Sequence, residues 1–155
     1  MFEFTFVEKP FLDRLVALDW TVIDQGAGIP TDPTKSLQKR GHACSLGGIF
    51  RHTGENDAYF GPYSQNNAEW MKQLIDRVRV DLDLSDIRLF ITEHHMDAPW
   101  GNAEIVNSAL TKMAANDSRV TKIKTSDLPH AKHHFGTRGT LILGETMADA
   151  FLANR

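Results

Sequence analysis

Histidine and carboxylate residues follow three apolar runs of strand length in this sequence. In a parallel α/β sheet the carboxyl ends of the strands meet at one edge, and such sheets bind their ligands there. Six of the seven histidines would share that edge, which predicts acid–base or nucleophile-assisting chemistry. The residues that follow the three runs are His52, Gly54, Glu55, Asn56 and Asp57; Glu93, His94 and His95; and Asp127, His130, His133 and His134.

The first run leads into a Gly-x-Asn-Asp segment. In acyl transfer, the backbone N–H of Gly54 and the side-chain amide of Asn56 could stabilise an oxyanion, with Glu55 beside them facing substrate. The alternative is a polar turn in which glycine provides an unusual backbone conformation and Asn or Asp caps it. Taken by itself, the segment is more typical of such a turn.

The third run leads into two candidate bases. Asp127 and His130 stand three residues apart, so the carboxylate could orient the imidazole and the imidazole could act as general base. His134 directly precedes Phe135 and a glycine-containing helical segment. The alternative for this stretch is a solvated loop with surface histidines.

The elements that must position these residues alternate in type from residue 46 onward. This β-α-β-α-β-α order predicts an α/β fold with a doubly wound parallel sheet and right-handed crossovers. Three strands are few for such a sheet, so residues 20–23 could add a fourth, or the unit is partial. By hydrophobic spacing, strands are expected at 46–52, 87–92 and 120–124 and helices at 64–82, 102–116 and 137–153.

The first part of the chain differs in composition. Residues 9–20 have the spacing of a short amphipathic helix, and residues 25–41 are rich in Gly, Pro, Thr and Asp, as linkers are. We therefore expect two parts, an N-terminal helix and linker over 1–44 and the α/β domain over 45–155.

Composition excludes several classes of protein. The 17 basic and 20 acidic residues are mixed along the chain and give a net charge of −3, which argues against nucleic acid or an anionic membrane as partner. The start of the chain lacks signal-peptide features and no run could span a bilayer, so a cytoplasmic product is expected. Cys44 is the one cysteine, which excludes an internal disulfide and a cysteine-rich zinc site.

From about residue 46 to residue 155 the sequence resembles the C-terminal part of the sialate O-acetylesterase-like carbohydrate esterases of the SGNH hydrolase superfamily. The resemblance lies in residues 49–57, 93–102 and 133–141. It implies a flavodoxin-like α/β hydrolase that removes acetyl groups from sugars with a serine nucleophile and a histidine base, without metal or cofactor. By this resemblance His134 is the catalytic histidine, and full-length relatives can be secreted.

Three departures from that pattern matter. The family usually has an acidic residue three before the catalytic histidine, where this chain has Ala131, so Asp127 with His130 could be the local pair. Thr53 replaces a glutamine associated with the oxyanion hole. Residues 1–45 contain no early Gly-Asp-Ser or Gly-Gln-Ser-Asn block, and residues 8–37 instead resemble the N-terminus of type I restriction endonuclease motor subunits. The sequence thus predicts a truncated esterase joined to a foreign start, with the activity of this chain left open.

Two other interpretations use the same residues. A zinc hydrolase could draw ligands from the histidines with Asp57 or Asp127, although no His-x-His or His-Glu-x-x-His motif is present. A non-catalytic module could retain only sugar binding, for which aromatic residues beside the rim are suited. These aromatic residues are Tyr59, Phe60, Tyr63 and Trp100. Self-association through an exposed sheet edge is also expected for a partial domain.

Overall fold

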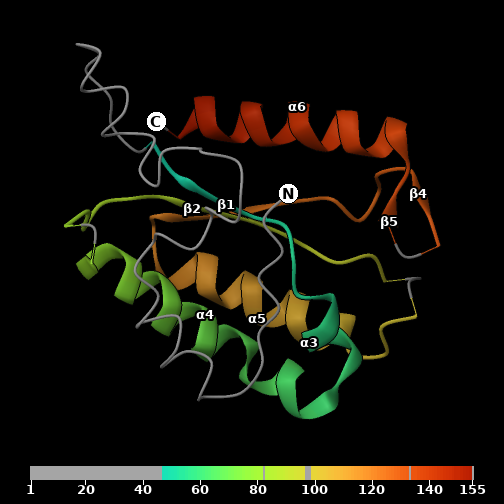
Figure 1. Cartoon of the computed structure of the whole chain (residues 1–155), viewed down its shortest axis with the longest axis horizontal. Helices are drawn as coiled ribbons and strands as arrows, with labels where there is room; N and C mark the ends of the chain where they lie inside the picture. The colour runs from blue at the N-terminus through green and yellow to red at the C-terminus, as the bar shows by residue number, and fades with distance from the viewer. Residues whose placement is uncertain (1–46, 82, 97–98, 133, 155) are drawn as a thin grey trace, which may run out of the picture. The chain divides into compact units, whose positions relative to one another are not determined.

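A three-stranded parallel sheet organises the part of the chain that the computed structural model describes, residues 47–81, 83–96, 99–132 and 134–154 (Figure 1). Its strands are β1 (Ile49–Arg51), β2 (Leu89–Thr92) and β3 (Val120–Ile123), in the spatial order β1-β2-β3. Both neighbouring pairs are parallel. The predicted α/β fold with a parallel sheet is therefore confirmed.

Helices cover both faces of this sheet. The helices α4 (Gly61–Asp81) and α5 (Ala103–Asn116) lie together on one face, and α6 (Thr137–Ala153) lies on the other (Figure 1). Each of the three agrees with a predicted helix within three residues at its ends. The fold thus has the layers of a doubly wound unit, with two crossover helices on one side.

Two short elements differ from the sequence prediction, which expected loops in their place. One is the single-turn helix α3 (Glu55–Tyr59), and the other is the hairpin of β4 (His130–Ala131) and β5 (His134–Phe135). Elements this short carry almost no periodic hydrophobic signal, because one helical turn or two strand residues do not fill a repeat. Tertiary contacts therefore decide whether they form.

The central strand β2 supplies the middle of the core. All four of its residues are buried, as expected for a strand covered on both faces. On the α6 side, the rings of Phe50 and Phe90 stack at 4.7 Å, and Phe151 meets Phe90 edge-on at 5.9 Å. Phe90 is fully buried, and full burial of a side chain of this size contributes about 1.5–3 kcal/mol, so contact with it helps to hold α6 against the sheet.

Ion pairs secure the amino end of the sheet. The guanidinium of Arg79 in α4 lies 2.9 Å from the carboxylate of Asp117 and donates to the Ile87 carbonyl at 3.2 Å. The guanidinium of Arg119 also donates to the Asp117 carboxylate. The hydrogen bonds from Arg119, and to a smaller extent the one from Arg79, hold the pKa of Asp117 well below its usual range. Ion pairs therefore occupy the amino end of the sheet, and the candidate functional residues lie at the opposite, carboxyl end.

The predicted N-terminal helix, the candidate strand at 20–23 and the predicted boundary near residue 44 lie outside the described residues. Among the helices that are described, none has the length and apolarity needed to cross a bilayer.

We predict opposite effects for alanine at two glycines of α6. A Cβ at Gly139 would lie 2.0 Å from the Pro129 carbonyl oxygen, whereas at Gly144 it would meet nothing within 4 Å. Gly139→Ala should lower the free energy of unfolding by about 1–3 kcal/mol or more, because backbone must move. Gly144→Ala, the matched control, should raise it by about 0.5–1 kcal/mol. Urea unfolding measures both, and a stability change of the same sign in the two variants would contradict the packing described.

Candidate functional site

The three segments predicted to share the carboxyl edge of the sheet begin there; the predicted His133 lies outside the described residues. His52 follows β1, Glu93 and the two histidines after it follow β2, and the segment from Thr125 follows β3. The ring nitrogen Nδ1 of His52 lies 2.7 Å from the Thr92 hydroxyl, so the end of β1 is joined to the end of β2. The prediction that the three strand ends form one rim is confirmed.

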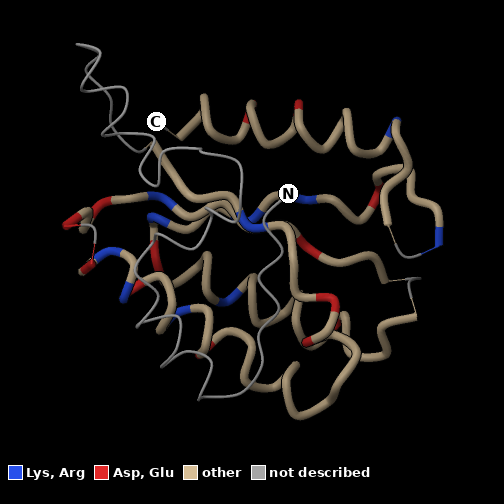
Figure 2. Tube along the Cα trace, in the orientation of Figure 1, with Lys and Arg blue, Asp and Glu red and all other residues tan. Residues whose placement is uncertain are grey.

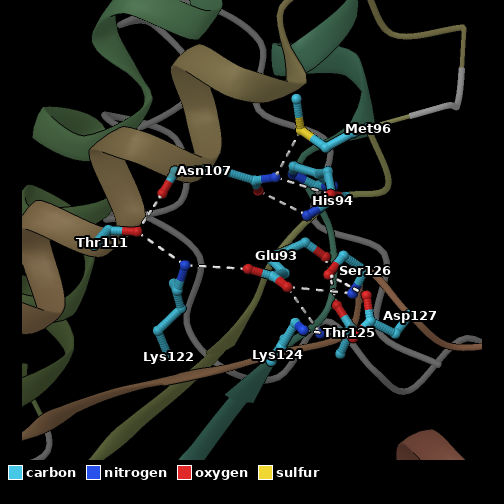
Figure 3. A network of polar contacts seen from close by, with 10 residues as sticks. All are labelled: Glu93, His94, Met96, Asn107, Thr111, Lys122, Lys124, Thr125, Ser126 and Asp127. Atoms are coloured by element: carbon cyan, nitrogen blue, oxygen red, sulfur yellow. Dashed lines mark hydrogen bonds and ion pairs between the residues drawn. The ribbon is translucent and has the colours of Figure 1, made fainter.

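A buried carboxylate joins the ends of β2 and β3 (Figure 3). Glu93 accepts hydrogen bonds from the backbone N–H groups of Thr125 at 3.3 Å and Ser126 at 3.2 Å. Its other oxygen lies 3.1 Å from Nζ of Lys122, and its carbonyl accepts the Thr125 hydroxyl at 2.6 Å. Burial alone would raise the pKa of Glu93, but the hydrogen bonds from Ser126 and Lys122 outweigh it and leave the pKa lowered. Glu93 is therefore an ionised anchor for the segment after β3.

His94 is held rigidly and kept neutral. The side-chain amide of Asn107 in α5 accepts the His94 N–H at 2.7 Å and donates to the His94 carbonyl at 2.8 Å, which clamps its backbone (Figure 3). Trp100 meets the imidazole edge-on at 5.8 Å. Burial, with the adjacent Arg51 charge, lowers the pKa of His94 to about 4. Its buried Nε2 atom has no hydrogen-bond partner among the described residues.

Gly54 turns the chain tightly against His94. Its φ of 122° is one that side-chain-bearing residues rarely adopt, and a Cβ there would lie 2.9 Å from Nε2 of His94 and 3.0 Å from Nη2 of Arg51. Beneath this turn, Asp57 accepts a hydrogen bond from Asn67 at 2.6 Å and lies 3.8 Å from the Arg51 guanidinium. Burial lowers the pKa of Arg51 to about 10, so the group stays charged at neutral pH. The predicted polar turn at Gly54 thus also brings the backbone close to the ring of His94.

Aromatic contacts connect the histidines to the β4–β5 hairpin. Phe135 stacks on His52 at 5.2 Å and meets His95 edge-on at 4.8 Å. The rings of His95 and His130 are 3.8 Å apart. Nδ1 of His95 donates to the Ser126 carbonyl at 3.0 Å, because a carbonyl oxygen only accepts, and this fixes the ring tautomer. Segments from all three strand ends therefore meet around one phenylalanine.

Comparison with known proteins gives the family. A family model described as carbohydrate esterase, sialic acid-specific acetylesterase, matches residues 32–153. The chain belongs to this family. A search of the curated proteins finds no match.

One solved structure similar to this chain is that of a protein from Arabidopsis thaliana at 1.6 Å resolution. The TM-score is 0.67 at 23% sequence identity, over 78% of this chain and 49% of that one. At this identity the likeness concerns the fold. The chain spans about half the length of that protein.

In this member of the family, the predicted site residues fall in different surroundings. Gly54 is buried, Glu55 is half-buried and Asn56 is exposed on α3. His130 is half-buried beside His95, and His134 is exposed on β5.

Asp127 is an exposed carboxylate that pairs with Lys124 and accepts the Ser126 hydroxyl at 3.2 Å. These are its hydrogen bonds among the described residues, and the Lys124 contact is the main cause of its lowered pKa. The carboxylate that was predicted to orient a histidine is therefore paired with Lys124.

Burial also keeps His52 neutral near pH 7. Desolvation is the main cause of the lowered pKa of His52, and the charge of Glu55 opposes this effect. The charges of His95, Arg51 and His134 lower the pKa of His52 further. No three His, Cys, Asp or Glu side chains in the described part of the chain are grouped to hold a metal ion.

Sequence reasoning did not assign roles to the residues that support this rim. Glu93 was visible as a polar residue at a strand end, but its partners lie about thirty positions further along the chain. Asn107 carried no signal except that an amide interrupts the apolar spacing of α5. Phe135 was visible only as a neighbour of His134. A hollow between α4 and α5, lined among others by Lys72, Glu104 and Met113, contains none of the rim residues.

We predict that Glu93→Gln lowers the free energy of unfolding by about 1–3 kcal/mol at neutral pH, because an amide cannot accept from the two backbone N–H groups and the Lys122 ammonium together. The pKa of Glu93 is lowered in the folded chain, so its stabilisation is present above the unfolded carboxyl pKa and is lost as the pH falls through the folded value. The stability gap between wild type and variant should therefore narrow in acid.

Urea unfolding at several pH values measures this gap. The matched control is Asp81→Asn, which removes an exposed ion pair with Arg77 and should change stability by less than about 0.5 kcal/mol. A gap that widens in acid would show that Glu93 is not the ionised anchor.

Proposed function

We propose that the carboxyl rim of this chain forms the base and oxyanion side of a site for acetyl esters of carbohydrates. The observation that carries the proposal is the convergence of the Gly54 turn and the histidines at one sheet edge, in a chain that belongs to a carbohydrate esterase family. Ester hydrolysis needs a base for the attacking hydroxyl and donors for the developing oxyanion. Residues of these types are what the rim holds.

His134 is the base in this proposal. It is exposed, so an ester can reach it, and it directly precedes Phe135, which packs against His52 and His95. Asp127 orients the His134 imidazole in this proposal after releasing Lys124. Its exposed position between β3 and the hairpin that carries His134 supports this role. His130 is the alternative base, and its ring lies 3.8 Å from that of His95.

The Gly54 turn is the oxyanion side. The close approach of Gly54 to His94 and Arg51 leaves no room for a side chain, which supports a role for its backbone. Asn56 contributes its exposed amide, and Glu55 faces the sugar hydroxyls at the start of α3. In this arrangement neutral His94 supports the turn and the Arg51 charge strengthens the local positive field.

We further propose that this chain is a truncated esterase that lacks the serine nucleophile. The sequence contains no Gly-Asp-Ser or Gly-Gln-Ser-Asn block. Among the described serines, none stands at a turn that leads directly from a strand into a helix, where a nucleophile would be exposed. The chain would then bind acetylated sugars without turning them over efficiently.

We predict that the purified chain hydrolyses p-nitrophenyl acetate and acetylated sugars no faster than free imidazole does at the same concentration. A base and an oxyanion site without a positioned hydroxyl lose nucleophilic catalysis, and triad enzymes lacking one member retain only about 10³–10⁴-fold over water. Initial rates against substrate concentration, with fluorophosphonate labelling, measure this. Labelling of one serine together with saturable turnover would show that the chain holds a nucleophile.

We predict that His134→Asn removes most of the remaining imidazole-type rate, with a loss of about tenfold or more. His130→Asn is the matched control and should change the rate far less, since that ring is half-buried against His95. Hydrolysis of p-nitrophenyl acetate from pH 6 to 8 compares the two variants. Equal losses, or a larger loss in His130→Asn, would identify the pair of Asp127 and His130 as the working one.

A further inference from the structure

Four aromatic side chains form a continuous surface at the junction of α3 and α4. We call Tyr59, Phe60, Tyr63 and Trp70 the aromatic surface. Tyr59 and Phe60 are 59% and 50% exposed, and the other two are half-buried. Consecutive rings lie 5.1, 5.7 and 5.9 Å apart, the first two pairs edge-to-face. Exposed aromatic groups of this extent mark binding sites more often than solitary exposed apolar residues do.

The backbone beneath this surface is held in place. Asn102, at the start of α5, donates to the Ala58 carbonyl through its N–H at 2.9 Å and its side-chain amide at 3.2 Å. The Phe60 N–H donates to the Asn56 carbonyl at 3.1 Å, and the Ser64 hydroxyl donates to the Gly61 carbonyl at 2.7 Å. The rings are therefore presented by a rigid turn, which reduces the entropy lost when a ligand binds.

The aromatic surface begins where the Gly54 turn ends. Only α3 separates the two, and five residues of helix rise about 7 Å. Trp100, half-buried after β2, contacts His94 of the rim. The Gly54 turn and the start of the aromatic surface are thus separated by about the length of one or two sugar rings.

Charge around this surface narrows the class of ligand. Residues 52–71 include Glu55, Asp57 and Glu69 but no lysine or arginine, and Figure 2 shows acidic and no basic positions along α3. Arg51, the nearest preceding cation, is buried and ion-paired with Asp57. Over residues 52–71, a ligand carboxylate, such as that of a sialic acid, would meet Glu55 and the exposed Glu69 and no lysine or arginine, and Lys72, just beyond, is paired with Asp76.

We propose that the aromatic surface is a subsite for a neutral pyranose ring of a glycan, next to the sugar held at the rim. The C–H groups of a pyranose face carry partial positive charge and pack on the negative faces of aromatic rings. The two exposed rings provide that platform, and the exposed Asn56 amide offers hydrogen bonds to hydroxyls. The glycan class rests on the proposed function, but the subsite needs no catalysis.

Binding of unesterified oligosaccharides tests the subsite independently of hydrolysis. Xylohexaose, cellohexaose and 3′-sialyllactose would be titrated into the full chain, followed by saturation-transfer NMR and calorimetry. We expect at least one neutral oligosaccharide to bind more tightly than 3′-sialyllactose. The double variant with Tyr59→Ala and Phe60→Ala should weaken that binding about tenfold, the effect of losing about one stacking contact.

Two controls make the result specific. Leu141→Ala removes a 65% exposed apolar side chain from α6 and should leave sugar binding unchanged, and Phe60→Tyr should preserve it. No binding of either neutral sugar, equal binding by the double variant, or tighter binding of 3′-sialyllactose would each overturn the subsite. Analytical ultracentrifugation would also overturn the subsite if the wild-type chain formed a dimer and the double variant did not. The aromatic surface would then bind a second copy of the chain. Failure of the esterase proposal alone would alter none of these binding results.

Discussion

The carboxylate of Glu93 is the interaction on which the rim depends. It is buried at the end of the central strand and accepts hydrogen bonds from two backbone N–H groups of the segment after β3, while its own carbonyl accepts the Thr125 hydroxyl. A buried ionised carboxylate is costly unless several donors satisfy it, and here two N–H groups and Lys122 do so. The two strand ends are therefore locked in one register, and the Ser126 carbonyl is fixed where it receives His95.

Contacts on both sides of Glu93 hold the remaining rim residues in place. His95, once its tautomer is set, packs against His130 and Phe135, and Phe135 in turn supports His52. On the other side of Glu93, Asn107 clamps the backbone of His94, whose ring supports the Gly54 turn. A rim built this way is preorganised, which is the property that electrostatic stabilisation of a reaction requires.

Burial divides the histidines into two kinds. His94 and His52 are kept neutral by desolvation and neighbouring charge, so they suit structural roles or hydrogen bonding in the neutral form. His134 is exposed on the hairpin, where solvent and a substrate can reach its ring. The division gives a physical reason for the proposed base to lie on the hairpin, while the buried His94 supports the Gly54 turn.

The sequence by itself determined the elements and their order. Hydrophobic spacing located β2, β3 and the three long helices within three residues at their ends, because helices and strands of that length repeat their period. The β-α-β order then required parallel strands and a common carboxyl edge, which placed most of the chemistry-bearing residues on one rim before any contact was known. The family resemblance over residues 46–155 followed from the same motifs and agrees with the family model over 32–153.

The tertiary structure decided what each residue does at that rim. The partners of Glu93 and His94 come from other elements, at sequence separations that no local pattern encodes. It also decided which histidines are buried, that Asp127 pairs with Lys124, and that residues 130–135 form a hairpin. Such features depend on packing between distant segments and on desolvation, and both arise only when the whole chain has folded.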